Sequence, residues 1–82
     1  MSFFDAIDSL GTPRQVTRGA TTFSIIAIAE PMAGGQRVRT RTELKPGDLV
    51  ELDKNRWKIV RAAPWKYDGE TLYECDAVAE LY

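Results

Sequence analysis

Residues 44–60 read LKPGDLVELDKNRWKIV, and this pattern predicts two β-strands joined by a tight turn. Pro46-Gly47-Asp48 leads into an alternating strand at 49–52. The turn Asp53-Lys54-Asn55 follows, and a second strand begins at Arg56-Trp57. Because this hairpin carries almost no catalytic chemistry, we expect a scaffold that presents surfaces to partners.

The chain is 82 residues long, which is enough for one domain that buries about 60 to 65% of its unfolded surface. Oligomerisation is one way in which so small a domain gains stability. The formal net charge of −1 gives no overall basic bias toward nucleic acids or anionic membranes, so any basic recognition must be local. The sequence has no long apolar run that could span a membrane, and its N-terminus has no signal-peptide pattern, so we expect a cytosolic compartment.

The sequence contains no histidine and a single cysteine, Cys75. The absence of histidine excludes Ser-His-Asp triads and imidazole metal sites. Cys75 lies in an alternating apolar strand, where a buried thiol is the expected state and a reactive thiol is the alternative. Neither a glycine-rich phosphate loop nor a calcium loop is present. We therefore expect no enzymatic activity, no catalytic residue, no cofactor, no metal and no small-molecule substrate.

Residues 1–13 predict a short helix and linker, followed by a single β-domain at 14–82. Ser2 can cap the helix, and Gly11 and Pro13 end it. The helix carries one apolar stripe, formed by Phe3, Ile7 and Leu10. A helix this short must dock to be stable. It either caps an open end of its own sheet or partly frays, or it is an amphipathic hook for a neighbouring subunit, formed by Phe3, Phe4, Ile7 and Leu10.

Two strands are expected at 14–17 and 22–29, where β-branched and apolar residues dominate. Arg18-Gly19 between them predicts a turn. Residues 30–35, EPMAGG, contain one proline and two glycines. They predict a flexible loop whose placement suits a binding role.

The strand expected at 36–42 carries three arginines on one face, because strand side chains alternate. We call Arg37, Arg39 and Arg41 the arginine ladder; its members would stand about 6.6 to 6.8 Å apart, opposite Val38, Thr40 and Thr42. The ladder either marks a solvated edge strand, or pairs with acidic side chains of another subunit, or contacts nucleic-acid phosphates.

Pro64 is expected to end the strand at 56–63, because proline cannot donate to a β-ladder. Residues 65–70 then predict a loop with Asp68-Gly69 at its turn. Two aromatic residues of this loop, Trp65 and Tyr67, either fold back over the core or anchor an interface.

The last strand alternates from Tyr73 onward, with apolar residues on one face and Glu74, Asp76 and Glu80 on the other. One face should therefore lie on the core and the other in water. The acidic row could also face the arginine ladder, either within one subunit or between two. The complete strand pattern predicts an all-β domain of about six antiparallel strands with a short N-terminal helix.

Several segments together are similar to a known protein family: RQVTRG, FSIIAIAE, the glycine-containing loop, LKPGDLVELDKNRWKIVRAAP and YECDAVAE. They resemble the small head–tail joining proteins of tailed bacteriophages, which include head-closure (stopper) and tail-attachment proteins. The resemblance covers residues 14–80. Its most specific part is the hairpin, with Gly47-Asp48, Asn55-Arg56, Trp57 and Ile59.

The resemblance implies an all-β barrel or sandwich that assembles as a homo-oligomeric ring at the portal vertex, between head and tail. Such a protein works in the neck of the virion and is assembled in the host cytoplasm. Its partners would be the portal or connector and the tail proteins, with genomic DNA close by in the channel and no membrane involved. Docking would use the N-terminal segment and the loops at 30–35 and 65–70. The resemblance carries over no individual binding residue.

Two other classes of protein stay open. An SH3-like nucleic-acid-binding module also contains Pro-Gly-Asp hairpins, and its binding would depend steeply on salt concentration. A monomeric protein-interaction domain would bind a peptide at an unpaired strand edge such as 36–42.

Overall fold

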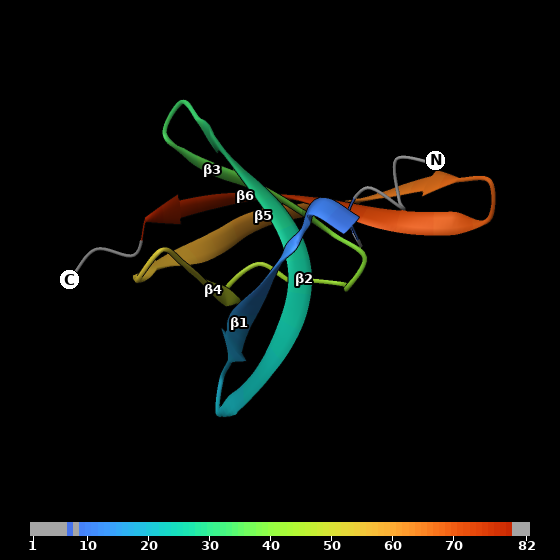
Figure 1. Ribbon diagram of the computed structural model, residues 1–82. Coiled ribbons are helices and arrows are strands. Elements are labelled where there is room, and N and C mark those ends of the chain that lie inside the picture. The colour runs from blue at the N-terminus through green and yellow to red at the C-terminus, as the bar shows by residue number, and fades with distance from the viewer. Residues whose placement is uncertain (1–6, 8, 80–82) are drawn as a thin grey trace.

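The computed structural model describes residue 7 and residues 9–79, which form a closed antiparallel barrel (Figure 1). Neighbouring strands follow the order β1-β2-β3-β6-β5-β4, and β4 pairs with β1 to close the barrel. The strands are β1 (Thr12–Arg18), β2 (Thr21–Met32), β3 (Gly35–Thr40), β4 (Leu49–Leu52), β5 (Asn55–Tyr67) and β6 (Glu70–Ala79). The predicted all-β fold is confirmed, and of the two expected architectures, barrel and sandwich, the structure has the barrel.

The interior of the barrel is filled by alternate residues of every strand, as the two-residue period of a β-strand requires. The buried apolar set is Val16, Ile25, Ala27, Val38, Val50, Leu52, Ile59, Cys75 and Ala77, joined by Leu44 from the loop before β4. Full burial of a Val, Leu or Ile side chain contributes about 1.5 to 3 kcal/mol. These side chains therefore supply most of the stability of so small a domain.

The β4–β5 hairpin has the position predicted from residues 44–60. Its turn consists of Asp53 and Lys54, whose φ angles are 50° and 74°. Two positive φ angles define the turn type whose twist matches that of the flanking strands. Leu52 pairs with Asn55, so the turn is one residue shorter than predicted.

The predicted strand end at Pro64 and the predicted loop at 65–70 are wrong. β5 continues through Pro64 to Tyr67, and a two-residue turn at Asp68-Gly69 leads directly into β6. Proline is tolerated on a strand that has a free edge. Only the first four residues of β5 pair with β4. Within the described part of the chain, the later residues of β5 therefore have β6 as their sole neighbouring strand.

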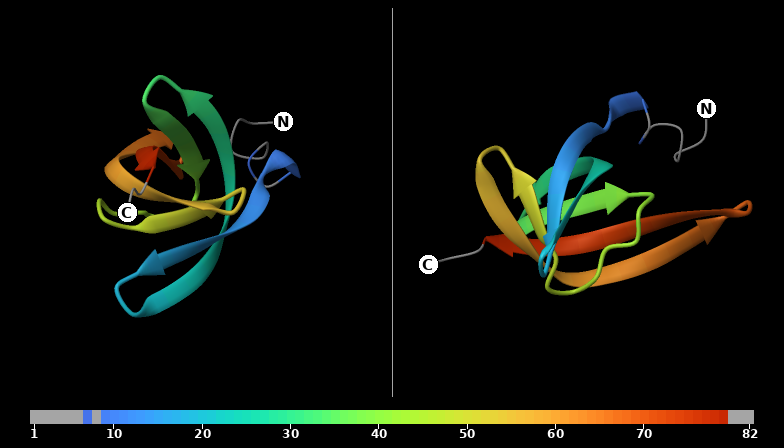
Figure 2. Two further views of the ribbon diagram at one scale, coloured as in Figure 1. Left: turned by 90° about the vertical axis from the view of Figure 1, so that its left-hand side faces the viewer. Right: turned by 90° about the horizontal axis from the view of Figure 1, so that it is seen from below.

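The loop predicted at 30–35 is also mostly strand. β2 runs on to Met32 and β3 begins at Gly35, so that only Ala33 and Gly34 form the turn. The hairpins β1–β2, β2–β3 and β5–β6 project from the barrel in different directions (Figure 1, Figure 2).

The N-terminal helix predicted for residues 1–13 falls largely outside the described residues, and so do Phe3 and Phe4. Ile7, Ser9 and Leu10 have helical backbone. The Gly11 amide donates a hydrogen bond of 2.8 Å to the Ile7 carbonyl, which is a helical spacing.

Ile7 is fully buried on the outside of the barrel, where it packs against Leu72 and Ile28. These two residues alternate with core residues of β6 and β2, and would otherwise face water. Ile7 therefore covers its own chain, and the interpretation of Ile7 as a contact for a neighbouring subunit does not fit its burial. Leu10, by contrast, is 74% exposed.

Candidate functional site

The arginine ladder lies on the outer face of the barrel, because Val38 and Thr40 point inward and are fully buried. Arg41 follows directly after β3, which ends at Thr40. β3 lies between β2 and β6, so the interpretation of 36–42 as a solvated edge strand is wrong. The same pairing leaves no free edge here for a peptide to join.

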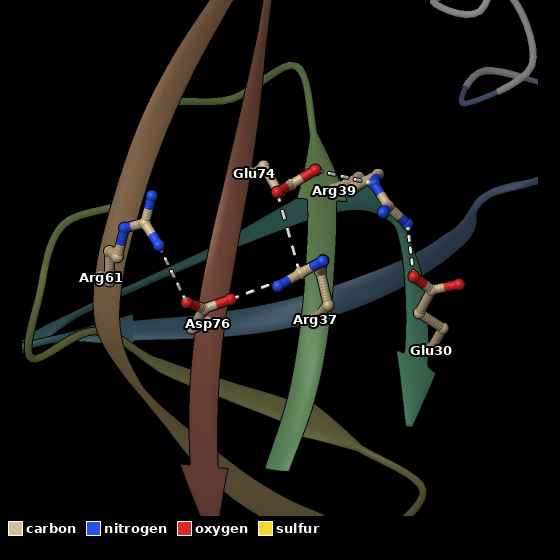
Figure 3. Close-up of polar contacts among 6 residues, drawn as sticks. All are labelled: Glu30, Arg37, Arg39, Arg61, Glu74 and Asp76. Carbon is tan, nitrogen blue, oxygen red and sulfur yellow. Dashed lines mark hydrogen bonds and ion pairs between the residues drawn. The ribbon is translucent and has the colours of Figure 1, made fainter. Parts of the chain in front are cut away.

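Arg37 and Arg39 pair with Glu74 and Asp76 of β6 within one chain (Figure 3). Glu80, the third residue of the predicted acidic row, lies outside the described residues. The strand register places Arg37 opposite Asp76 and Arg39 opposite Glu74. Arg37 Nε lies 3.4 Å from Asp76 Oδ1 and 3.8 Å from Glu74 Oε1, and Arg39 Nε lies 3.3 Å from Glu74 Oε2. Of the two arrangements left open by the sequence, the structure has the one within a subunit.

Neighbouring strands extend this charged network across the outer face, as Figure 3 shows for the first two pairs below. The flanking pairs are Arg39–Glu30 at 2.9 Å, Arg61–Asp76 at 3.6 Å and Arg41–Glu70 at 2.6 Å. Opposite charges thus alternate from β2 across β3 and β6 to β5. Pairs of this exposed kind contribute up to about 1 kcal/mol each, and they leave the face close to neutral.

Trp65 lies on the part of the β5–β6 hairpin that extends beyond the barrel. β3 pairs with β6 only from Tyr73 onward, so residues 64–72 pair with β5 or β6 alone, and we call them the β5–β6 arm. Trp65 pairs with Leu72, yet it is 59% exposed whereas Leu72 is buried beneath Ile7. Trp65 therefore does not fold back over the core. Tyr67 is the last residue of β5.

Asp48, from the Pro-Gly-Asp sequence, is a buried carboxylate held by three hydrogen bonds. Arg18 donates two of them, from Nε at 2.9 Å and from Nη2 at 2.7 Å, and the Lys45 amide donates the third at 2.8 Å. The hydrogen bonds from Arg18 lower the pKa of Asp48, and they outweigh the opposite effect of burial. Arg18 also stacks on the Phe23 ring at 5.1 Å. The Asp48 carboxylate thus holds the loop before β4 against the end of β1.

Cys75 is buried in the core with its thiol protonated. Burial, followed by the charges of Asp76, Asp48 and Glu74, raises the pKa of the Cys75 thiol to about 12. The described residues contain no group of three or more His, Cys, Asp or Glu side chains that could hold a metal ion. In the same part of the chain, no helix is long and apolar enough to cross a membrane.

A pocket of about 310 Å³ opens at one end of the barrel, between the β2–β3 and β4–β5 hairpins. Its walls are inward-facing or turn residues, namely Arg14, Ala29, Pro31, Gln36, Leu52, Asp53, Asn55 and Trp57. Sequence reasoning missed Arg14 as a candidate. The signal was present, because Arg14 stands two residues before the core residue Val16 and must share its inward face.

No protein-family model matches the chain, and neither a curated protein nor a solved structure matches it. The candidate surfaces must therefore be judged on their own geometry. They are the charged outer face, the β5–β6 arm and the pocket at the barrel end.

Proposed function

We propose that this chain is a structural assembly protein of a phage or prophage particle, which forms a ring at the head–tail junction that connects or closes the portal and docks the tail. The proposal is supported by the sequence resemblance and by a small antiparallel barrel of the class that the resemblance implies. One observation carries it furthest, the exposed Trp65 on the projecting β5–β6 arm.

The arm contacts the rest of its own subunit through Ile7 over Leu72 and through the Arg41–Glu70 ion pair at 2.6 Å. A two-stranded hairpin is at best marginally stable in water, and this one is covered on one face by Ile7 over Leu72. An exposed tryptophan at such a position gains free energy when a partner covers it, and tryptophan is enriched among the residues that dominate interfaces. The arm therefore suits insertion against a neighbouring subunit or a neck protein.

The charged outer face is a weaker candidate for a contact between subunits than the sequence suggested. Its arginines have acidic partners in their own chain, so their charge is largely neutralised before any contact is made. In a ring, we therefore assign most of the contact energy to the arm. The charged outer face would contribute at most to the choice and orientation of the partner.

The nucleic-acid alternative has less support. Phosphate binding releases counterions only where cations are available, and here a phosphate would have to displace the carboxylates of Glu74 and Asp76. The net charge of −1 works against such displacement.

Sedimentation of Trp65→Ser beside the unchanged protein tests the contact. We expect the unchanged protein to self-associate and the variant to associate more weakly by roughly tenfold or more. Lys66→Ser is the matched control, because Lys66 is an exposed neighbour on the same arm whose side chain points to the other face. Equal association of all three proteins would contradict a role for the arm.

Deletion of the gene in its source tests the proposal as a whole. We expect particles with DNA-filled heads and no tails, rescued by the unchanged gene and by Lys66→Ser but not by Trp65→Ser. Normal infectious particles after deletion would overturn it.

A further inference from the structure

β1 carries an inward-facing arginine at each end of the barrel, with the buried Val16 between them. Arg18, at one end, has three partners among the described residues: the carboxylate of Asp48, the carbonyl of Glu43 at 3.2 Å and the Phe23 ring. Arg14, at the other end, stands opposite Ile25 in the register with β2 and lines the pocket. Both arginines lie on the inward face of β1, but they differ in their hydrogen-bond partners.

The guanidinium of Arg14 is poorly satisfied within the described residues. Its Nε is buried and has no hydrogen-bond partner among them. Its Nη1 lies 3.7 Å from Asp53 Oδ1, beyond hydrogen-bond distance, and the Asp53 side chain is 91% exposed. A buried donor without a partner is costly. The Arg14 side chain as a whole is 23% exposed and lines the pocket, so a ligand carboxylate can accept from its terminal Nη groups.

The other lining residues and the volume of the pocket limit the chemical group that can carry such a carboxylate. Leu52, Ala29 and Pro31 are apolar, and the half-buried indole of Trp57 forms a flat wall. The amides of Gln36 and Asn55 lie at the rim and can accept or donate. The volume of about 310 Å³ is at the lower end of the range for ligand pockets, so the body must be short.

We infer that the barrel end is a binding site for a carboxylate carried on a short apolar body, with Arg14 as the anchor and Trp57 as the apolar wall. A phosphate fits less well, because Arg14 is the one cationic residue among the described residues that line this pocket, and Asp53 beside it repels a second negative charge. The inference is independent of any role in a phage particle, and it departs from the expectation that the chain takes no small molecule.

Fluorescence of Trp57 gives a direct measurement of binding. The chain has two tryptophans, so Trp65→Phe leaves Trp57 as the only one, and Trp65 does not line the pocket. In this background we expect hexanoate to change the Trp57 emission saturably, and hexanamide, which has the same body without the charge, to bind more weakly by roughly tenfold or more. Equal binding of the two probes would overturn the inference.

Arg14→Gln tests the anchor, with Arg61→Gln as its matched control. Arg61 lies on the outer face and its side chain is 70% exposed. We expect Arg14→Gln to weaken hexanoate binding by roughly tenfold or more and Arg61→Gln to leave it within about twofold. Unchanged binding by Arg14→Gln would overturn the inference.

Asp53→Asn keeps the inference testable if Arg14→Gln fails to fold, since Asp53 is exposed in a turn. Removing this competing carboxylate should strengthen hexanoate binding by roughly two- to fivefold. Unchanged or weaker binding would contradict the assigned anchor.

A blocked tetrapeptide whose only charge is one Glu separates the two sources of such a carboxylate. Binding of hexanoate without the peptide supports a free small acid. Binding of both supports the acidic side chain of a protein partner. Binding of neither overturns the site.

Discussion

The guanidinium of Arg18, at the end of β1, donates two hydrogen bonds to the carboxylate of Asp48, from Nε to Oδ1 at 2.9 Å and from Nη2 to Oδ2 at 2.7 Å. The two residues are 30 positions apart in the chain. Asp48 is only 2% exposed. The Asp48 amide also donates to the Lys45 carbonyl at 3.0 Å, and Gly47 between them has a φ of 98°. The turn before β4 is thereby tied to the far end of the β1–β2 hairpin, close to the point where β4 closes the barrel against β1.

Asp48→Ala should be among the most destabilising single changes in the chain. It removes three hydrogen bonds, but Arg18, whose side chain is 39% exposed, can be solvated by water, so we expect a loss of about 1 to 3 kcal/mol in the free energy of unfolding. Asp53→Asn is the control, because asparagine tolerates the φ of 50° at this position and the exposed pair at 3.7 Å should cost less than about 0.5 kcal/mol. Urea unfolding of the two variants measures the difference, and equal losses would contradict this role for Asp48.

The same pair predicts how stability depends on pH. The Arg18 hydrogen bonds hold the pKa of Asp48 below its ordinary value of 3.8, so the folded state keeps its carboxylate charged where the unfolded state takes up a proton. This contribution is present above the unfolded pKa and is lost as the pH falls through the folded pKa. Asp48→Asn should therefore be less sensitive to acid than the unchanged protein. Parallel stability curves below about pH 4 would show that Asp48 does not titrate in this way.

Gly35→Ala should disrupt the seam between β3 and β6. A Cβ at this position would lie 2.0 Å from the Ala77 carbonyl oxygen, so the two strands would have to separate. We expect a loss of about 3 kcal/mol or failure to fold. Gly19→Ala is the control: its φ of 59° carries a penalty of about 1 to 2 kcal/mol, but no atom lies within 4 Å of the added Cβ. Thermal unfolding that ranks Gly19→Ala as the more damaging change would refute the close contact.

Local chemistry accounts for what the sequence predicted correctly. The alternation of Val38 and Thr40 with the arginine ladder, and of Cys75 and Ala77 with the acidic row, follows from the two-residue period and needs no knowledge of the rest of the fold. The β4–β5 hairpin was predictable for the same reason, since its turn residues and its strands are adjacent in the chain.

The remaining features depend on which strands are neighbours, and no local pattern contains that information. From sequence alone, Pro64 predicts the end of a strand. It is tolerated inside β5 because this part of β5 has a free edge, which only the strand order reveals. Whether the arginine ladder faces solvent, a partner or the acidic row of its own chain cannot be decided until β3 is placed beside β6, about 40 residues later in the chain. The pocket at Arg14 is likewise formed by segments that meet only when the barrel closes.

Arg37→Ser, Arg39→Ser and Arg41→Ser combined should lower stability rather than association. Each arginine has an acidic partner in its own chain, and cross-strand pairs contribute about 0.2 to 1 kcal/mol each. We expect a total loss of about 1 to 2 kcal/mol that becomes smaller at high salt, because the pairs are partly exposed. Urea unfolding and sedimentation at low and high salt measure the two effects. Unchanged stability with weakened association would instead place the ladder in a contact between subunits.

Cys75 should be inert to thiol reagents in the folded protein. Its pKa of about 12 keeps the folded thiol protonated, while the unfolded thiol ionises near its ordinary value of 9.0. Stability should therefore fall as the pH rises from about 9 toward 12, by up to about 1.4 kcal/mol per pH unit from this group. Cys75→Ala removes this dependence, and the difference between the two proteins isolates it from other groups that titrate in the same range. A chromogenic disulfide added at about pH 8 should react no faster than the protein opens, so immediate reaction in native buffer, at the rate of the urea-unfolded chain, would show that the thiol is accessible.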